Sequence, residues 1–106
     1  MIKVLIFKQQ NCAPCKTLTD SIVSERENNL DPTDRWDENV TFIYYDMTDA
    51  SDQIMEEAIK YNVRSAPTVV VLDANDSVYY SGTMVKTVDK IKELVKEAKN
   101  VWQTIP

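Results

Sequence analysis

A change of hydrophobic period near residue 12 constrains this chain more than any other feature. Residues 3–7 form a continuous, β-branched apolar run, which is typical of a strand buried on both faces. After a polar turn at residues 8–11 the apolar spacing becomes helical. Pro14 fits only the first turn of that helix, where its missing N–H would have no partner anyway. The only two cysteines, Cys12 and Cys15, lie at this junction.

Further segments of the chain alternate between strand-like and helix-like patterns. Predicted strands span residues 40–45, 69–72 and 78–80, and predicted helices run over residues 12–28, 49–62 and, after a cap at Thr87, up to residue 102. The first two strands are joined through a helix and should be parallel, with a right-handed crossover. A turn at residues 74–77 makes the last two a hairpin. The predicted fold is therefore α/β, with a four-stranded mixed sheet (β-α-β-α-β-β-α) flanked by helices.

Each predicted helix carries an apolar stripe that is most simply assigned to the core. The stripes comprise Cys15, Leu18, Ile22 and Val23; Ile54, Met55, Ala58 and Ile59; and Ile91, Leu94, Val95, Ala98, Val101 and Trp102. Thr48, Asp49 or Ser51 is expected to cap the second helix. Trp36 lies in a polar loop at residues 30–39 and is expected to anchor that loop against the domain. The only glycine, Gly82, indicates a positive φ or a close backbone approach.

Composition restricts the class of protein. A chain of 106 residues suits a single domain spanning residues 1–106, expected to be a monomer. The net charge of −5, without a basic cluster, argues against nucleic-acid binding. The longest apolar runs are too short to span a membrane, and no signal peptide is apparent, so a cytoplasmic location is expected. The chain contains no histidine, the commonest general base and metal ligand.

The spacing of the two cysteines indicates redox chemistry. Cys12 would lie at a helix N-terminus, where unpaired N–H groups and the helix dipole stabilise a thiolate and should lower its pKa. Cys12 is therefore the candidate nucleophile and should be the more exposed thiol. Cys15, one turn further in, is the candidate resolving thiol. Ala13 and Pro14 would tune the pair, and Lys16 would add a nearby charge. Two alternatives remain open: inert buried cysteines, and a zinc or iron–sulfur site, which two thiols could complete only in a dimer.

Residues 11–16, Asn-Cys-Ala-Pro-Cys-Lys, closely resemble the thioredoxin motif. The resemblance extends to residues 61–68, which are similar to the thioredoxin segment that carries a cis-proline, and to Gly82 after the final strand. It implies a thioredoxin fold with a cis Ala66–Pro67 bond facing the dithiol. It also implies that Ala66, Pro67 and Thr68 bind substrate as an added strand. Asn11 stands where thioredoxins usually have a tryptophan, and is the remaining candidate for substrate contact.

Several departures make the chain glutaredoxin-like as well. It begins directly at the active-site strand, and Ile6 stands where thioredoxins have a buried aspartate that assists proton transfer. Both features resemble glutaredoxins. Pro14 and residues 81–83, Ser-Gly-Thr, nevertheless depart from the usual glutaredoxin pattern. The identity of the reductant is therefore left open by the resemblance.

By resemblance, the chain is expected to be a protein-disulfide reductase, an electron carrier in cell redox homeostasis that needs no cofactor or metal of its own. Its substrates would be disulfide-containing proteins such as ribonucleotide reductase. Its reductant would be a thioredoxin reductase or glutathione, the acidic charge balance favouring the reductase. The alternatives are a glutathione-dependent reductase of glutaredoxin type and a non-enzymatic subunit of a larger complex. No membrane or nucleic-acid partner is expected.

Overall fold

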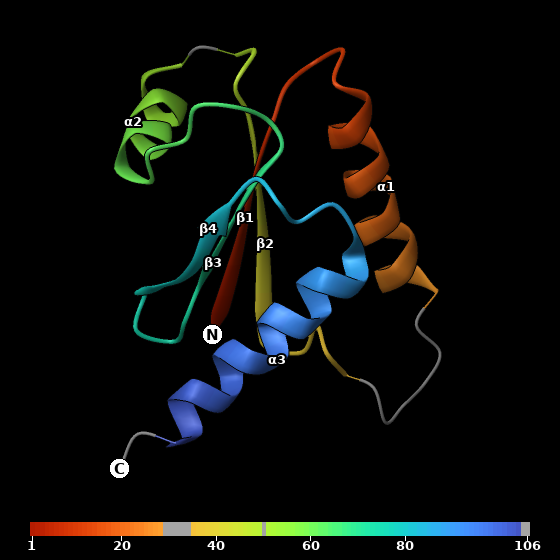
Figure 1. The fold of residues 1–106 in the computed structure, drawn as a ribbon, viewed down its shortest axis with the longest axis vertical. Coiled ribbons are helices and arrows are strands. Elements are labelled where there is room, and N and C mark those ends of the chain that lie inside the picture. The colour runs from red at the N-terminus through yellow and green to blue at the C-terminus, as the bar shows by residue number, and fades with distance from the viewer. Residues whose placement is uncertain (29–34, 50, 105–106) are drawn as a thin grey trace.

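The computed structural model describes residues 1–28, 35–49 and 51–104, and for residues 101–104 it describes the helical backbone only. Four strands and three helices make up this part of the chain (Figure 1). They are β1 (Ile2–Lys8), α1 (Ala13–Glu27), β2 (Val40–Asp46), α2 (Asp52–Lys60), β3 (Thr68–Leu72), β4 (Val78–Gly82) and α3 (Val88–Thr104). This order is the one predicted from the sequence.

The strands form one mixed sheet in the order β2-β1-β3-β4. β1 and β2 are parallel and in register from Ile2 opposite Val40 to Lys8 opposite Asp46. β3 runs antiparallel to β1, and β4 completes the predicted hairpin with β3. β1 is therefore a central strand, with β2 on one side and β3 on the other. The predicted α/β fold with a four-stranded mixed sheet is confirmed.

Both faces of the sheet are covered, as the apolar strands require. On one face, Val4 and Ile6 pack in a cluster with residues of α1 and α3 such as Leu18 and Ile91. On the other face, Leu5 and Phe7 belong to a cluster that includes residues of and after α2: Ala58, Tyr61 and Val63. In Figure 1, α2 stands apart from α1 and α3. No helix in the described part of the chain has the length and apolar character needed to cross a membrane.

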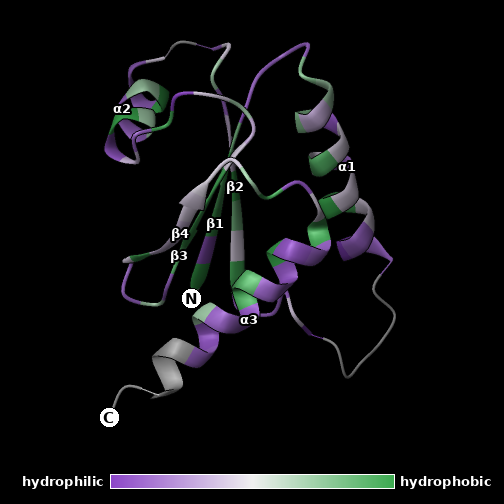
Figure 2. Ribbon diagram, viewed as in Figure 1, coloured by the Kyte–Doolittle hydropathy of each residue, from purple (hydrophilic) through white to green (hydrophobic). Residues whose placement is uncertain are grey.

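The core assignment of the α2 stripe was wrong for two of its residues. Ile59 is 74% exposed and Met55 is 49% exposed. The helix is shorter than predicted, because Ser51 caps it, its Oγ accepting the N–H of Ile54, and it ends at Lys60. So short a helix reaches the core mainly through Ala58. Apolar residues therefore remain on its surface, where Figure 2 shows hydrophobic colour.

α1 and α3 follow their predicted patterns more closely. In α1 the buried residues are Cys15, Leu18 and Ile22, but Val23 is 43% exposed and its core assignment was wrong. Each successive residue is rotated by about 100° around the helix axis. Val23, one residue after the buried Ile22, therefore lies beyond the edge of the narrow buried face of α1. In α3, Ile91, Leu94, Val95 and Ala98 are buried. The predicted core side chains of Val101 and Trp102 lie outside the described residues, as do residues 30–34 of the predicted loop.

Gly82 ends β4, opposite Val69, and its φ is not positive. Of the two alternatives that the sequence indicated, the positive φ is therefore not the one observed. The close approach is confirmed, because a Cβ at this position would lie 2.8 Å from the hydroxyl oxygen of Tyr80. Any larger residue at Gly82 would have to displace that tyrosine ring.

Trp36 anchors the segment before β2 in the core, as predicted. Its side chain is only 2% exposed and meets Phe42 edge-on, with ring centroids 5.8 Å apart. Its carbonyl oxygen accepts a hydrogen bond from Nζ of Lys99 in α3, at 3.1 Å. Trp36 thus connects this segment to both a strand and a helix.

Replacing Trp36 by alanine should lower the free energy of unfolding by about 3–5 kcal/mol, since a fully buried indole leaves a large cavity. The matched control is Ile59→Ala on α2, which should change stability by less than about 0.5 kcal/mol because the side chain is exposed. Urea unfolding of both variants and the parent measures the difference. Equal losses in the two variants would contradict the burial described here.

Candidate active site

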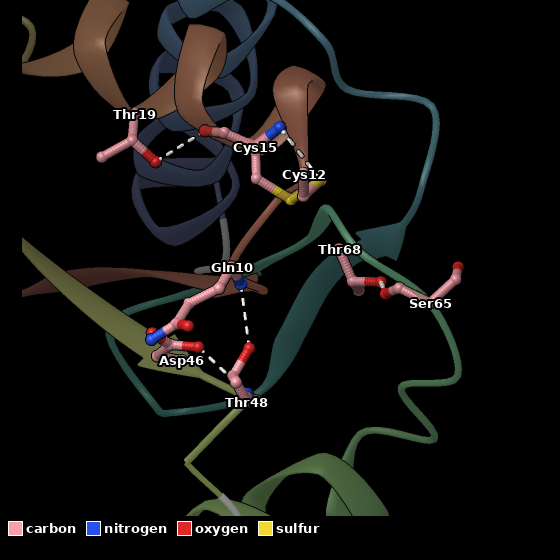
Figure 3. Close-up of a disulfide and its surroundings, with 8 residues drawn as sticks. All are labelled: Gln10, Cys12, Cys15, Thr19, Asp46, Thr48, Ser65 and Thr68. Carbon is pink, nitrogen blue, oxygen red and sulfur yellow. Dashed lines mark hydrogen bonds between the residues drawn. A yellow bond between two sulfur atoms is a disulfide. The ribbon is translucent and has the colours of Figure 1, made fainter.

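The turn between β1 and α1 is held in place by the turn that follows β2. The N–H of Met47 donates to the carbonyl oxygen of Lys8 at 2.8 Å. The N–H of Gln10 donates to the Thr48 hydroxyl at 2.9 Å, as Figure 3 shows. Asn11, which ends the turn, has a φ of 57°, a left-handed conformation that asparagine tolerates better than most residues. The chain therefore enters α1 from a fixed direction.

Cys12 occupies the N-cap of α1, and Cys15 lies in its first turn. The two form a disulfide, with Cα atoms 5.2 Å apart. The N–H of Cys15 points to Sγ of Cys12 at 3.3 Å, and the N–H of Lys16 donates to the carbonyl oxygen of Cys12 at 3.1 Å. Cys15 is 2% exposed, whereas Cys12 is half-buried. The predicted difference in exposure and the predicted helix position are both present.

The other residues of the motif lie on the surface. Ala13 and Pro14 are exposed, and Pro14 is in the first turn, where the sequence required it. Lys16 is exposed, and its Nζ pairs with a carboxylate oxygen of Asp20 at 2.7 Å. This hydrogen bond and the carboxylate charge raise the pKa of Lys16. The ammonium group is thus partnered by Asp20, and a tuning effect of Lys16 on the dithiol remains a prediction.

The segment before β3 lies on the other side of β1 from β2. The Ala66–Pro67 peptide bond is cis, as the resemblance implied. Pro67 is buried and Ala66 is half-buried. Thr68 is 4% exposed, and its hydroxyl donates to the carbonyl oxygen of Ser65 at 2.6 Å, so its side chain is used to hold this turn. Figure 3 shows Thr68 and Ser65 in the surroundings of the disulfide.

A cleft of about 710 Å³ opens beside the disulfide on the β2 side. Most of the residues that line it have polar or charged side chains; the lining comprises Lys8, Gln9, Gln10, Asn11, Cys12, Ala13, Cys15, Lys16, Thr19, Asp20 and Asp46. None of the residues 66–68 lines it. The dithiol therefore has two different neighbouring surfaces, the polar cleft toward β2 and the proline turn before β3.

Sequence reasoning missed Lys8, Thr19, Asp20 and Asp46 as neighbours of the dithiol. One available signal was the predicted parallel pairing of the first two strands. The carboxyl ends of parallel strands meet at one edge of a sheet, so the residue after the strand at 40–45 should lie near the end of the first strand. The register confirms this, because Lys8 is opposite Asp46.

Two observations concern the ionisable and metal-binding groups around this site. Ile6, at the position where thioredoxins have a buried aspartate, is fully buried in the core and offers no ionisable group. Across residues 1–28, 35–49 and 51–104, no group of three or more Cys, Asp or Glu residues is arranged to hold a metal ion.

Comparison with known proteins finds similarity in structure only. Neither a protein-family profile nor a curated protein matches the sequence. Among solved structures, a mutant thioredoxin from Halobacterium salinarum is 19% identical, with a TM-score of 0.69 over 99% of this chain and 78% of its own. Thioredoxin 1 of Thermosipho africanus is 15% identical, with a TM-score of 0.68 over 96% of this chain and 99% of its own. Fasciola hepatica thioredoxin is 23% identical, with a TM-score of 0.68 over 92% of this chain and 81% of its own.

The fold is therefore the thioredoxin fold, and the chain is thioredoxin-like in architecture. It carries a disulfide with CxxC spacing at the start of α1. At identities this low, the likeness establishes the fold and leaves the activity to be argued from the site itself. The fold together with the disulfide supports thiol–disulfide oxidoreductase chemistry as the general class of activity.

In the reduced protein, iodoacetamide should alkylate Cys12 at least about tenfold faster than Cys15, because Cys12 is the more exposed thiol and lies at the helix N-terminus. Mass spectrometry of peptides after short labelling measures the two rates. The Cys15→Ser variant should retain the fast labelling, and the Cys12→Ser variant should lose it. Faster labelling of Cys15 would contradict the assignment of Cys12 as the accessible thiol.

Proposed function

We propose that this protein is a thiol–disulfide oxidoreductase that reduces disulfides in other proteins through Cys12 and Cys15. The observation that carries the proposal is the Cys12–Cys15 disulfide at the N-cap of α1, with one sulfur accessible and the other buried. A pair of thiols that forms a disulfide within the first turn of a helix can give two electrons to a client disulfide and later be reduced again.

The first step is attack by the Cys12 thiolate on a sulfur atom of the client disulfide. A bond forms between Sγ of Cys12 and that sulfur, the client S–S bond breaks, and the other client sulfur leaves as a thiolate. The N–H of Cys15, which points to Sγ of Cys12, and the unpaired N–H groups of the first turn favour negative charge at this position. We therefore expect the pKa of the Cys12 thiol to lie below that of free cysteine.

The second step is attack by Cys15 on Sγ of Cys12. The mixed disulfide breaks, the second client sulfur leaves as a thiolate, and the Cys12–Cys15 disulfide forms. Overall the client disulfide gains two electrons, and the dithiol loses two. The burial of Cys15 suits this order of events, because a buried thiol reacts with its neighbour in the same helix turn more readily than with an outside disulfide.

The client chain would lie along the turn before β3, where the resemblance places substrate contacts. Ala66 is half-buried there, and its backbone groups can pair with an extended segment. Pro67 and Thr68 would shape this surface, since the Thr68 hydroxyl is already bonded to Ser65. Asn11, exposed beside Cys12, would contact the client from the other side of the disulfide.

For the reductant, we propose a thioredoxin reductase in the cytoplasm, with ribonucleotide reductase as a representative client. The net charge of −5 supports this choice over glutathione, whose two carboxylates need positive partners. Lys16 beside the dithiol is already paired with Asp20. The glutathione-dependent alternative would require activity with glutathione and glutathione reductase, and Cys12 alone would then suffice to remove glutathione from a client.

The Cys12→Ser variant should lose insulin-disulfide reduction, because the attacking sulfur is gone. The Cys15→Ser variant should instead accumulate a covalent mixed disulfide with the client on Cys12, since the resolving sulfur is gone. Dithiothreitol-driven insulin turbidity and non-reducing mass spectrometry measure the two effects. Full activity of both variants would favour a non-enzymatic role, and trapping on Cys15 would reverse the two assignments.

A further inference from the structure

Resolution of the mixed disulfide requires Cys15 to lose a proton, and the structure identifies few groups that can take it. A thiol attacks only as its thiolate. Cys15 is 2% exposed, so the proton cannot pass freely to bulk solvent from every direction. The chain has no histidine, and Ile6 in the core offers no ionisable group. The cleft, which Cys15 itself lines, offers a route from this thiol to a proton acceptor.

Four charged groups line this cleft. They are Lys8 from β1, Lys16 and Asp20 from α1, and Asp46 from β2. On the opposite side of the disulfide, residues 65–68 carry no titratable side chain. Of these four side chains, the two carboxylates, Asp20 and Asp46, are the ones that can act as proton acceptors.

The two carboxylates differ in what they already bind. Asp20 is ion-paired with Nζ of Lys16 at 2.7 Å, so an ammonium group already occupies its carboxylate. Asp46 accepts the N–H of Thr48 at 3.0 Å through one oxygen, Oδ1, and within the described part of the chain it forms no ion pair. Asp46 is therefore the cleft-lining carboxylate without an ammonium partner among the described residues. Parallel pairing with Lys8 holds the Asp46 backbone in place.

We propose that Asp46 accepts the proton of Cys15 during resolution, through water in the cleft; this inference depends on the oxidoreductase function proposed above. A polar cleft of this size has room for water. The Cys15 S–H proton passes through that water to the Asp46 carboxylate. The Cys15 thiolate then forms the bond to Sγ of Cys12, the mixed disulfide breaks, and the client sulfur leaves with its electron pair. Asp46 then returns the proton to solvent. Asp46 is thus a positioning residue that acts on Cys15 without touching the client.

The test uses full-length reduced protein and dithiobis(nitrobenzoate) as the disulfide probe. Attack by Cys12 releases one thionitrobenzoate, and resolution by Cys15 releases a second, so stopped-flow absorbance separates the two steps. In Asp46→Asn the second phase should slow by about a hundredfold near pH 6.5, the low end of the range for general-base assistance. The difference should disappear near about pH 9, where thiols ionise without a base. The first phase should not change.

Asn at position 46 keeps an oxygen for the Thr48 N–H, so the turn should persist. The matched control is Asp49→Asn, an exposed carboxylate three residues on that does not line the cleft, and both phases should stay at the parent rate. The inference is overturned if Asp46→Asn leaves the second phase unchanged or slows it equally at every pH. It is also overturned if Asp20→Asn, and not Asp46→Asn, produces the slowing. A parent protein that releases no second thionitrobenzoate would contradict the proposed function itself.

Discussion

Burial of β1 on both faces is the constraint on which the candidate site depends. Val4 and Ile6 point into the core under α1 and α3, while Leu5 and Phe7 point into the core beside α2. β2 and β3 complete its hydrogen bonding on either side. A strand so enclosed is held rigidly, and the chain must leave it at one edge of the sheet. The turn at residues 9–11 and the start of α1 therefore lie at a defined place, and Cys12 lies there with them.

The same arrangement makes the two sulfur atoms unequal. Cys12, at the N-cap, has the helix N–H groups in front of it and partial access to solvent, whereas Cys15 faces inward. Because β1 is central, the dithiol also has two different neighbours: the Ala66–Pro67 turn before β3 and the polar cleft that ends at Asp46. One surface is suited to an extended client chain, and the other to water and proton transfer. The proposed reaction assigns one task to each.

Much of this could be predicted from local sequence. Pro14 and the change of period at residue 12 were enough to place Cys12 at a helix start, and the short turn at 74–77 was enough for the hairpin. The burial of Trp36 followed from the large apolar area of an indole. The failures concern tertiary packing. An amphipathic pattern cannot reveal that α2 contacts the sheet mainly through Ala58 and leaves Ile59 exposed. The cleft depends on strand register, and the internal bond of Thr68 depends on the turn geometry.

The central claim is that Cys12 and Cys15 form a reversible redox pair that works as a reductant. The most direct measurement is the reduction potential of this pair, obtained by equilibrating the protein in defined thiol–disulfide buffers and counting free thiols by alkylation and mass spectrometry. The account predicts a single two-electron transition near about −270 mV, the potential of thioredoxin. A potential above about −230 mV, in the range of glutaredoxins (about −200 to −230 mV) and protein disulfide isomerase (about −180 mV), would contradict a reductant fed by thioredoxin reductase. Failure to form the intramolecular disulfide at any potential would contradict the redox pair itself.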